Sequence, residues 1–194
     1  MSNNNFFAML SRMKYINRWG LMRNTITENI AEHSLETAFI AHALAVINNI
    51  YYEGDINPER VAIYAMYHDV PEIITGDLPT PVKYFDPTIK KSYDVVESVA
   101  VSKLLNSMPE EMRAVYENIL DEKNIQIEYR KIVKAADKIS ALIKCIEERK
   151  MGNQDFARAE NSTIAAIRKL ECREANYFLD NYIEAYGLTL DEQT

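Results

Sequence analysis

The residues best suited to chemistry in this chain are two histidines and two aspartates that could share one metal ion. His33 follows Glu32 near the start of a predicted helix, and His68 directly precedes Asp69 near the end of another. Asp137 lies beside an apolar helical face, where a carboxylate needs a partner. Two imidazoles and two carboxylates suit zinc, manganese, iron, cobalt or magnesium, and they leave positions open for water and substrate. We therefore expect one catalytic divalent cation at these four residues.

Each of these residues also has an ordinary explanation. A single histidine on a helix is more often hydrogen-bonded in the core than bound to metal, and a helical aspartate is usually solvated or paired with a lysine such as Lys138. Neighbouring helical residues point about 100° apart, so His68 and Asp69 need ligands from other helices. The metal hypothesis therefore depends on the four residues together, on three facing helices. His42, on the same helix as His33, is interpreted as a packed residue or as a support for the site.

The elements that must position these side chains are predicted to be helices. Glycine occurs only five times, and long stretches place apolar residues three and four positions apart. We expect an all-α fold with the metal site in the core of the helix bundle. The ligand-bearing part covers about residues 28–140. The expected helices cover residues 5–15, 31–51, 57–71, 87–106, 109–120, 127–150 and 155–186, with irregular segments at 17–29 and 75–81.

Local signals refine two of these helices. Asn57-Pro58 places a cap residue and a proline where a helix prefers to begin, and Pro71 should end or bend that helix. The 31–51 helix carries one stripe of large side chains, namely Leu35, Phe39, His42 and Val46.

The bulk composition fits a globular protein and argues against several classes. The chain has 194 residues and a net charge of −7, which is poorly suited to nucleic-acid polymers. Its two cysteines lie far apart, and no apolar run approaches the length of a membrane span or resembles a signal peptide. We expect one domain over residues 1–194, in the cytoplasm, with no membrane partner.

The pattern His33, His68-Asp69 and Asp137 resembles the HD-domain superfamily of metal-dependent phosphohydrolases. Flanking segments narrow the resemblance to bacterial 5′-deoxynucleotidases of the YfbR type, and the similarity extends over nearly the whole chain. The segments that carry it are Phe6-Phe7-Ala8, Ile16-Asn17-Arg18-Trp19, Leu21-Met22-Arg23-Asn24, Glu32-His33-Ser34, Ala65-Met66-Tyr67-His68-Asp69, residues 75–85 and Leu188-Thr189-Leu190-Asp191-Glu192.

This resemblance implies a specific activity. Enzymes of that type remove phosphate from deoxyribonucleoside 5′-monophosphates, act on several bases and discriminate against ribonucleotides. They are homodimers and need a divalent cation, which here could be cobalt, manganese, zinc or a similar ion. By the resemblance, the cation would be held by His33, His68, Asp69 and Asp137.

The resemblance also implies roles for residues outside the metal site. Arg18 would orient the phosphate, Trp19 would lie against the sugar, and Glu72 would assist the chemistry. Pro71 departs from the closest family pattern and could shift Glu72. Substrate contacts would come from Arg18, Trp19, His33, Asp69, Asp77, Leu78, Pro79, Thr80 and Asp137.

The residue types agree with these roles. Arg18 offers a planar fork that can bind two phosphate oxygens. Glu72 follows His68 by four residues and Asp69 by three, which places all three on one helix face. A carboxylate there could orient water or pass a proton to the leaving oxygen, and Asp77 on the adjacent loop is a second candidate for that proton.

Two other functions remain open from the sequence. A related enzyme could act on dNTPs, alarmones or cyclic nucleotides, but such substrates call for more basic residues than Arg18, Arg23 and Lys83 near the motifs. A non-catalytic nucleotide-binding helical scaffold is the other alternative. The presence of both Glu72 and Asp77 beside a full set of ligands argues against it.

Overall fold

The computed structural model describes residues 4–194, and every regular element in that range is helical. The sole β pairing among these residues is an isolated antiparallel bridge between Asn17 and Asn29. The all-α prediction is therefore confirmed. The α-helices are α1 (Phe6–Leu10), α2 (Ile30–Tyr51), α3 (Pro58–Tyr67), α4 (Glu72–Thr75), α5 (Thr80–Lys83), α6 (Pro87–Leu105), α7 (Glu110–Leu120), α8 (Ile127–Lys150), α9 (Ala157–Lys169) and α10 (Arg173–Asn181). Short 3-10 helices cover Ser11–Tyr15, Glu122–Asn124, Gln154–Phe156, Ile183–Gly187 and Leu190–Glu192.

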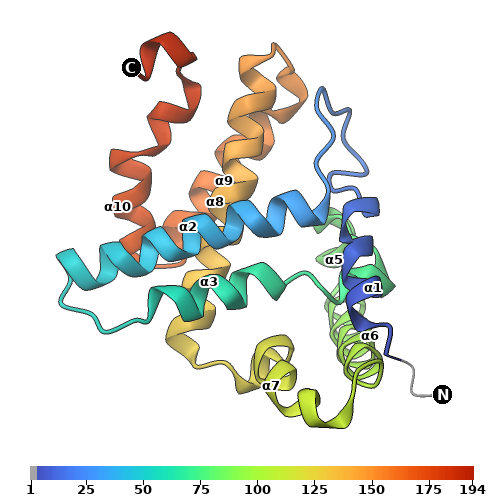
Figure 1. The fold of residues 1–194 in the computed structure, drawn as a ribbon. Coiled ribbons are helices and arrows are strands. Elements are labelled where there is room, and N and C mark those ends of the chain that lie inside the picture. Colours follow the sequence, from blue (N-terminus) through green and yellow to red (C-terminus); the bar gives the residue numbers. More distant parts are fainter. Residues whose placement is uncertain (1–3) are drawn as a thin grey trace.

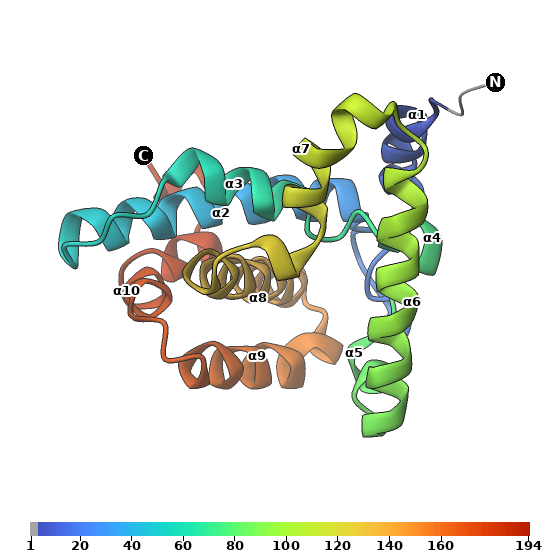
Figure 2. The ribbon, with the colours of Figure 1, turned by 90° about the horizontal axis from the view of Figure 1, so that it is seen from below.

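Helix α2 is the central element of the fold (Figure 1). It packs along α3 and across α8, and α8 packs in turn on α9, while α10 contacts α2, α8 and α9. Figure 2 shows α6, α7 and α1 gathered on the side of the molecule away from α10. The first turn of α2 and the segment after α3 lie between these two groups of helices.

Two hydrophobic clusters hold these groups together. The larger one packs α2, α3, α8 and α10 through fully buried residues such as Leu44, Val61 and Ile139. The smaller one joins the N-terminal segment to α6 and α7 around Phe6 and Leu104. Helix α2 begins in the smaller cluster at Ile30 and continues into the larger one, and the chain from α3 to Val70 runs from the larger cluster into the smaller one. The residues between, His33 among them, are therefore held from both sides.

The prediction of one continuous helix over residues 155–186 is wrong. The chain instead forms α9 and α10, separated by a turn in which Glu171 has a left-handed backbone with φ of 52°. This turn folds α10 back, so that Ala175 and Phe178 join the larger cluster. The helical periodicity on both sides is real, but it contains no signal for a single residue in the left-handed region.

The predicted end of α3 also differs from the structure. Asn57 caps the helix and Pro58 occupies its first turn, as expected, with the Asn57 side chain accepting from the Arg60 N–H at 2.7 Å. The helix ends at Tyr67, before Pro71, and a series of tight turns leads into α4.

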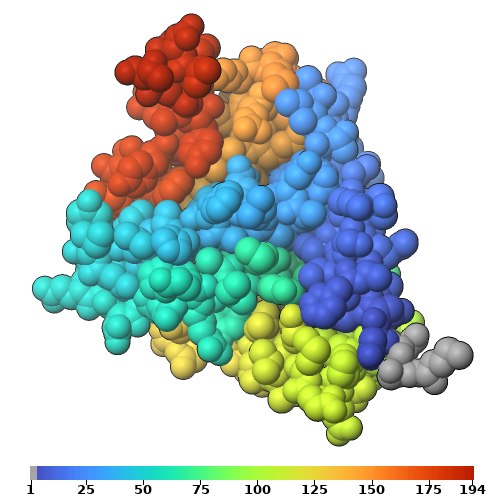
Figure 3. Space-filling model, viewed as in Figure 1, coloured from blue at the N-terminus to red at the C-terminus, as the bar shows by residue number. Residues whose placement is uncertain are grey.

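The stripe predicted on α2 faces outward. Phe39 is 67% exposed and Leu35 is 48% exposed, and both belong to the surface rather than the core. In Figure 3, α2 and α3 cover the middle of the face shown. By length and composition, α2 could also cross a membrane, which the apolar runs did not suggest. About 56% of its most apolar window is buried inside the protein, the pattern of a core helix.

Candidate functional site

The start of α2 fixes the first of the predicted ligands. Asn29 caps the helix by accepting from the N–H groups of Ala31 and Glu32 at 3.0 and 3.1 Å, and Glu32 accepts from the Asn29 N–H at 3.3 Å. This reciprocal capping box sets where the helix begins. His33 consequently lies in the first turn, where its side chain is fully buried.

Residues 68 and 69 converge because the helix ends just before them, at Tyr67. His68 is the C-terminal cap of α3, and the backbone turns immediately, with N–H···O bonds from Val70 to Tyr67 (3.2 Å) and from Glu72 to Asp69 (3.0 Å). In a continuous helix the two side chains would point about 100° apart. The turn brings both to the same point.

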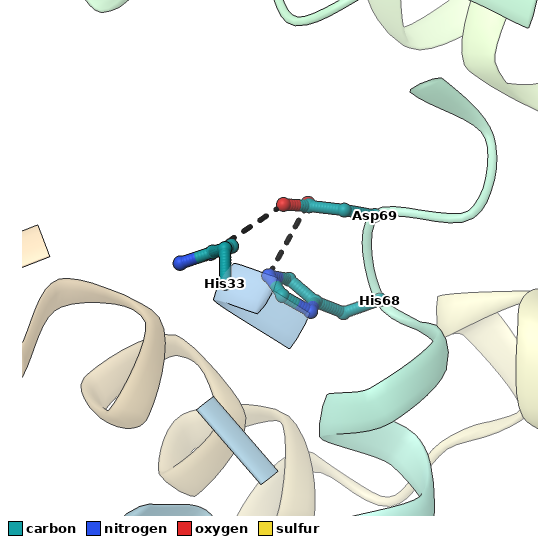
Figure 4. A group of neighbouring side chains, drawn as sticks. All are labelled: His33, His68 and Asp69. Carbon is teal, nitrogen blue, oxygen red and sulfur yellow. Dashed lines mark ion pairs between the residues drawn. The ribbon is translucent and has the colours of Figure 1, made fainter. Parts of the chain in front are cut away.

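The four predicted ligands meet at one place. Figure 4 shows three of them, His33, His68 and Asp69. His33 Nε2 lies 3.5 Å from Asp69 Oδ2 and 3.2 Å from Asp137 Oδ1. His68 Nε2 lies 3.2 Å from Asp69 Oδ1 and 4.0 Å from Asp137 Oδ1. His33, His68 and Asp69 alone form a group that could hold a metal ion, with ligand atoms within 4.8 Å of one another. Asp137 approaches this group from α8.

The hydrogen bonds of His68 show that this donor set fits a cation. His68 Nδ1 lies 2.6 Å from the Ala65 carbonyl oxygen, which can only accept, so Nδ1 carries the proton. The lone pair of Nε2 then faces the Asp69 carboxylate at 3.2 Å, and Nε2 is buried with no hydrogen-bond partner among the described residues. A metal ion would satisfy a buried nitrogen in this position.

Electrostatics at His33 lead to the same conclusion. Burial and the Arg18 charge lower the pKa of His33, but Asp137, Glu28 and Asp69 outweigh them and raise the pKa to about 9. Burial raises the pKa of Asp137, while His33, His68 and Arg18 outweigh it and hold that pKa well below its usual range. The cluster therefore draws positive charge, which a divalent cation would supply directly.

Glu72 and Asp77 add two further carboxyl groups to the pocket. Burial, together with the charges of Asp69 and Asp77, raises the pKa of Glu72 to about 10. Glu72 Oε2 is buried and finds no hydrogen-bond partner within residues 4–194. Burial and Asp69 also raise the pKa of Asp77, against the opposing effect of Arg18. Burial and the neighbouring carboxylates thus favour the protonated form of Glu72, the form that a proton donor needs.

Arg18 and Trp19 lie on the segment that precedes α2. Arg18 Nη2 is 3.8 Å from Asp137 Oδ1, and Arg18 Nη1 contacts His33 Nδ1. Trp19 has a left-handed backbone, with φ of 61°, and its ring lies 5.3 Å from that of Phe156. Such a backbone is rare for a bulky residue and frequently marks a functional segment.

The loop predicted to line the pocket, residues 77–80, is linked to the four candidate ligands only through Asp77 among the described residues. Asp77 is near enough to the cluster for Arg18, Asp69 and His33 to affect its pKa. Leu78 and Pro79 are half-buried, and Thr80 is exposed at the start of α5. No polar contact between these three residues and the four ligands occurs in the part of the chain that is described.

His42 is not part of the site, and the prediction that it packs or supports the site is wrong. It is exposed on α2. Nine residues amount to about two and a half helical turns, so His42 points away from His33.

Comparison with known proteins identifies the family. A family model described as 5′-deoxynucleotidase YfbR-like matches residues 5–186. This chain belongs to the YfbR-like family. A 5′-deoxynucleotidase from Cronobacter sakazakii is 46% identical over 192 residues, which cover 99% of this chain and 96% of that protein. The resemblance inferred from the sequence is confirmed.

Solved structures show that the YfbR-like chain has the HD-domain fold. An HD-domain phosphohydrolase from Listeria innocua matches with a TM-score of 0.84 at 24% identity, over 96% of this chain and 90% of that one. The cyanophage S-2L HD phosphohydrolase, solved with dA and one catalytic Zn²⁺ ion, matches with a TM-score of 0.66 at 18% identity, over 91% and 95%. The predicted HD-domain architecture is thereby confirmed.

Three residues at the YfbR-like site were missed by sequence reasoning. Ser140 Oγ lies 3.0 Å from His33 Nδ1 and donates to Glu36. Glu28 contacts Arg18 and lies 3.6 Å from His33 Nδ1. Glu36 follows His33 by three positions on α2, and Ser140 follows Asp137 by three on α8, so helical spacing could have indicated both. Glu28 carries no spacing signal, because it lies outside the helices.

Proposed function

We propose that this protein hydrolyses deoxyribonucleoside 5′-monophosphates to deoxyribonucleosides and phosphate, with one divalent cation held by His33, His68, Asp69 and Asp137. The observation that carries the proposal is the convergence of these side chains around His68 Nε2, which has no hydrogen-bond partner in the described part of the chain. The 5′-deoxynucleotidase relative supports the reaction, because it matches the chain from end to end.

The bound cation would supply Lewis-acid polarisation of a phosphate oxygen and of water. Arg18 is placed to bind two phosphate oxygens, since its guanidinium lies beside the cluster. Glu72 is placed to hold or move a proton, either at the attacking water or at the leaving O5′, and Asp77 is the second candidate for this step.

We further propose that Trp19 selects the sugar. Its indole would pack against C2′ of the nucleotide, where a hydroxyl group would find neither space nor a hydrogen-bond partner. The loop of Asp77, Leu78, Pro79 and Thr80 would line the rest of the pocket. Equal kcat/KM for dAMP and AMP in the wild-type protein would refute this role of Trp19.

The decisive experiment is a phosphate-release screen. Metal-stripped protein is supplied separately with cobalt, manganese, zinc and magnesium, and tested against all ribo- and deoxyribonucleoside monophosphates, dNTPs, cyclic nucleotides and alarmones. We expect release from the deoxyribonucleoside monophosphates, with cobalt, manganese or zinc the most effective. Preferred turnover of another group would establish the related-phosphohydrolase alternative, and binding without release would establish the scaffold.

Two kinds of variant separate metal binding from proton transfer. His68→Ala and Asp137→Asn should lose metal and activity together, as measured by metal analysis of the purified proteins. Glu72→Ala should retain metal and substrate binding and lose most of kcat. Asp94→Asn, at an exposed position on α6, is the matched control and should change neither. Full metal content in inactive Asp137→Asn would move Asp137 from ligand to catalyst.

We also propose that the protein acts as a homodimer in the cytoplasm. Leu35, Phe39 and Ile50 form an exposed apolar stripe on α2 that a second copy could cover by two-fold symmetry. Both cysteines are free and buried, which suits a reducing compartment. Phe39→Glu should yield monomers in sedimentation velocity, whereas Val115→Glu, an exposed apolar position on α7, should not. A dimeric Phe39→Glu variant would exclude this interface.

A further inference from the structure

Glu28 lies directly opposite Arg18, although ten positions separate them in the sequence. The segment before α2 turns back on itself through the Asn17–Asn29 bridge. The Arg18 N–H donates to the Glu28 carbonyl at 2.9 Å, and the Ile30 N–H donates to the Ile16 carbonyl at 3.0 Å. In Figure 1 this segment is the blue loop that precedes α2. The backbone therefore presents the Glu28 side chain to Arg18 and Trp19.

Each carboxylate oxygen of Glu28 holds a different residue. Oε1 accepts from Arg18 Nη1 at 3.3 Å, and Oε2 accepts from the Trp19 indole N–H at 2.8 Å. The side chain is only 12% exposed, so neither bond competes freely with water. A single carboxylate thus spans the two side chains that are proposed to contact the phosphate and the sugar.

The Trp19 ring is half-buried and packs on Phe156 in a tilted arrangement. Within residues 4–194, Glu28 provides the sole hydrogen bond to the indole nitrogen. The orientation of the ring therefore depends on Glu28.

We infer that Glu28 is a positioning residue that fixes the Trp19 indole beside Arg18 and thereby sets the preference for deoxyribose over ribose. The inference rests on the proposed function, because it assigns Trp19 to the sugar. Arg18 would contact the phosphate of either nucleotide, so a disturbance of Arg18 changes both reactions and cancels in their ratio. The ratio of kcat/KM for dAMP to that for AMP isolates the effect on Trp19.

Glu28→Gln tests the inference without changing side-chain size. The glutamine amide has one oxygen that can accept and one NH2 group that can only donate. The NH2 group therefore faces an N–H donor, from either Arg18 or the Trp19 indole. We expect the dAMP/AMP ratio of kcat/KM to fall at least about tenfold, since a hydrogen bond to a charged group is lost. Glu117→Gln, at an exposed position on α7, is the matched control and should leave the ratio unchanged.

A double variant distinguishes positioning from a general structural role. Trp19→Phe retains an aromatic ring but lacks the indole N–H, so it breaks the same contact from the other side and leaves the Glu28 charge in place. Glu28→Gln should lower the ratio no further in the Trp19→Phe background. Independent, multiplicative losses would overturn the inference. Should Glu28→Gln fail to fold, an unchanged ratio in Trp19→Phe would overturn it as well.

Fluorescence supplies a readout that needs neither metal nor turnover. Trp19 is the only tryptophan, so emission of the metal-free protein reports its surroundings when excitation lies beyond the tyrosine absorption. Glu28→Gln should shift the emission to longer wavelength and raise its quenching by acrylamide, and Glu117→Gln should do neither. A wild-type protein that releases no phosphate from any deoxyribonucleotide would refute the proposed function but leave this test intact. An active protein whose Glu28→Gln variant keeps its emission or its ratio would refute the inference.

Discussion

Replacing Glu148 with glutamine should release the loop that carries Arg18 and Trp19. The Glu148 carboxylate is 1% exposed and accepts from the Thr25 N–H at 2.9 and 3.0 Å. It also accepts from the Ile26 N–H at 3.1 Å and pairs with Lys144, four residues earlier on α8. The substitution keeps the side-chain volume and removes the charge, so it tests the buried ion pair itself.

The magnitude follows from what the substitution leaves behind. Lys144 stays buried at 5% exposure without its partner. Removing one member of a buried ion pair costs about 3–5 kcal/mol. In a chain of this size each kcal/mol lowers Tm by about 2–4 °C, so Tm should fall by roughly 6–20 °C.

Glu148→Gln should also change the pH dependence of the free energy of unfolding. Burial alone would raise the pKa of Glu148, but hydrogen bonds from Lys144, Asn153, Thr25 and Ile26 hold the pKa well below its usual range. A carboxyl group with a depressed folded-state pKa contributes stability above its unfolded pKa of about 4.3, and this stability is lost as the pH falls further. Below that pH the free energy of unfolding of the wild type should decline more steeply than that of Glu148→Gln.

Thermal and urea unfolding between pH 3 and pH 7 measure both effects. Asp94→Asn is the matched control, because Lys90 and Asp94 have the same four-residue spacing on α6 but are exposed. Its cost should stay below about 1 kcal/mol. If Glu148→Gln costs no more than Asp94→Asn and leaves the pH slope unchanged, the ion pair does not anchor the loop.

Three further substitutions test other parts of the structure. Ser140→Ala should weaken divalent-cation binding about 10–100-fold in calorimetry, because Ser140 orients a proposed ligand; unchanged affinity would refute this. Glu171→Gly should stabilise the protein by about 1 kcal/mol and raise Tm by a few degrees, because glycine adopts the left-handed backbone of this position without strain. The control Glu117→Gly, within α7, should lower Tm. Gly54→Ala should cost about 1–3 kcal/mol, since its Cβ would lie 1.4 Å from the buried Asn48 Oδ1; an unchanged Tm would show that this side chain yields.

The convergence of the four candidate ligands was predictable because residue types that can bind metal are recognisable in a sequence. Histidine is rare in this chain, so His33 and the His68-Asp69 pair are conspicuous in sequences of helical periodicity. The family resemblance pointed to the same residues. The helices were predictable for a related reason, since apolar spacing and caps such as Asn57-Pro58 act locally.

The parts that could not be predicted act between distant segments. Lys144 and Glu148 have the spacing of a solvated surface pair, and only the loop packed above them makes them buried. Glu28 lies in a segment without periodicity, and its partners depend on a fold-back that the sequence does not signal. The left-handed turn at Glu171 gave no signal either, because nothing in residue type requires it at that position.

Two carboxylates, the buried Glu148 and the half-buried Glu28, hold the Arg18–Trp19 segment in different ways. Glu148 binds backbone N–H groups at Thr25 and Ile26, so it determines where the loop lies. Glu28 binds the functional side chains themselves, so it determines how they point. A segment without regular secondary structure satisfies few of its own backbone polar groups, and here Glu148 from α8 accepts from two of them. Loss of Glu148 should therefore reduce stability and sugar selection together, whereas loss of Glu28 should reduce selection with a smaller change in Tm.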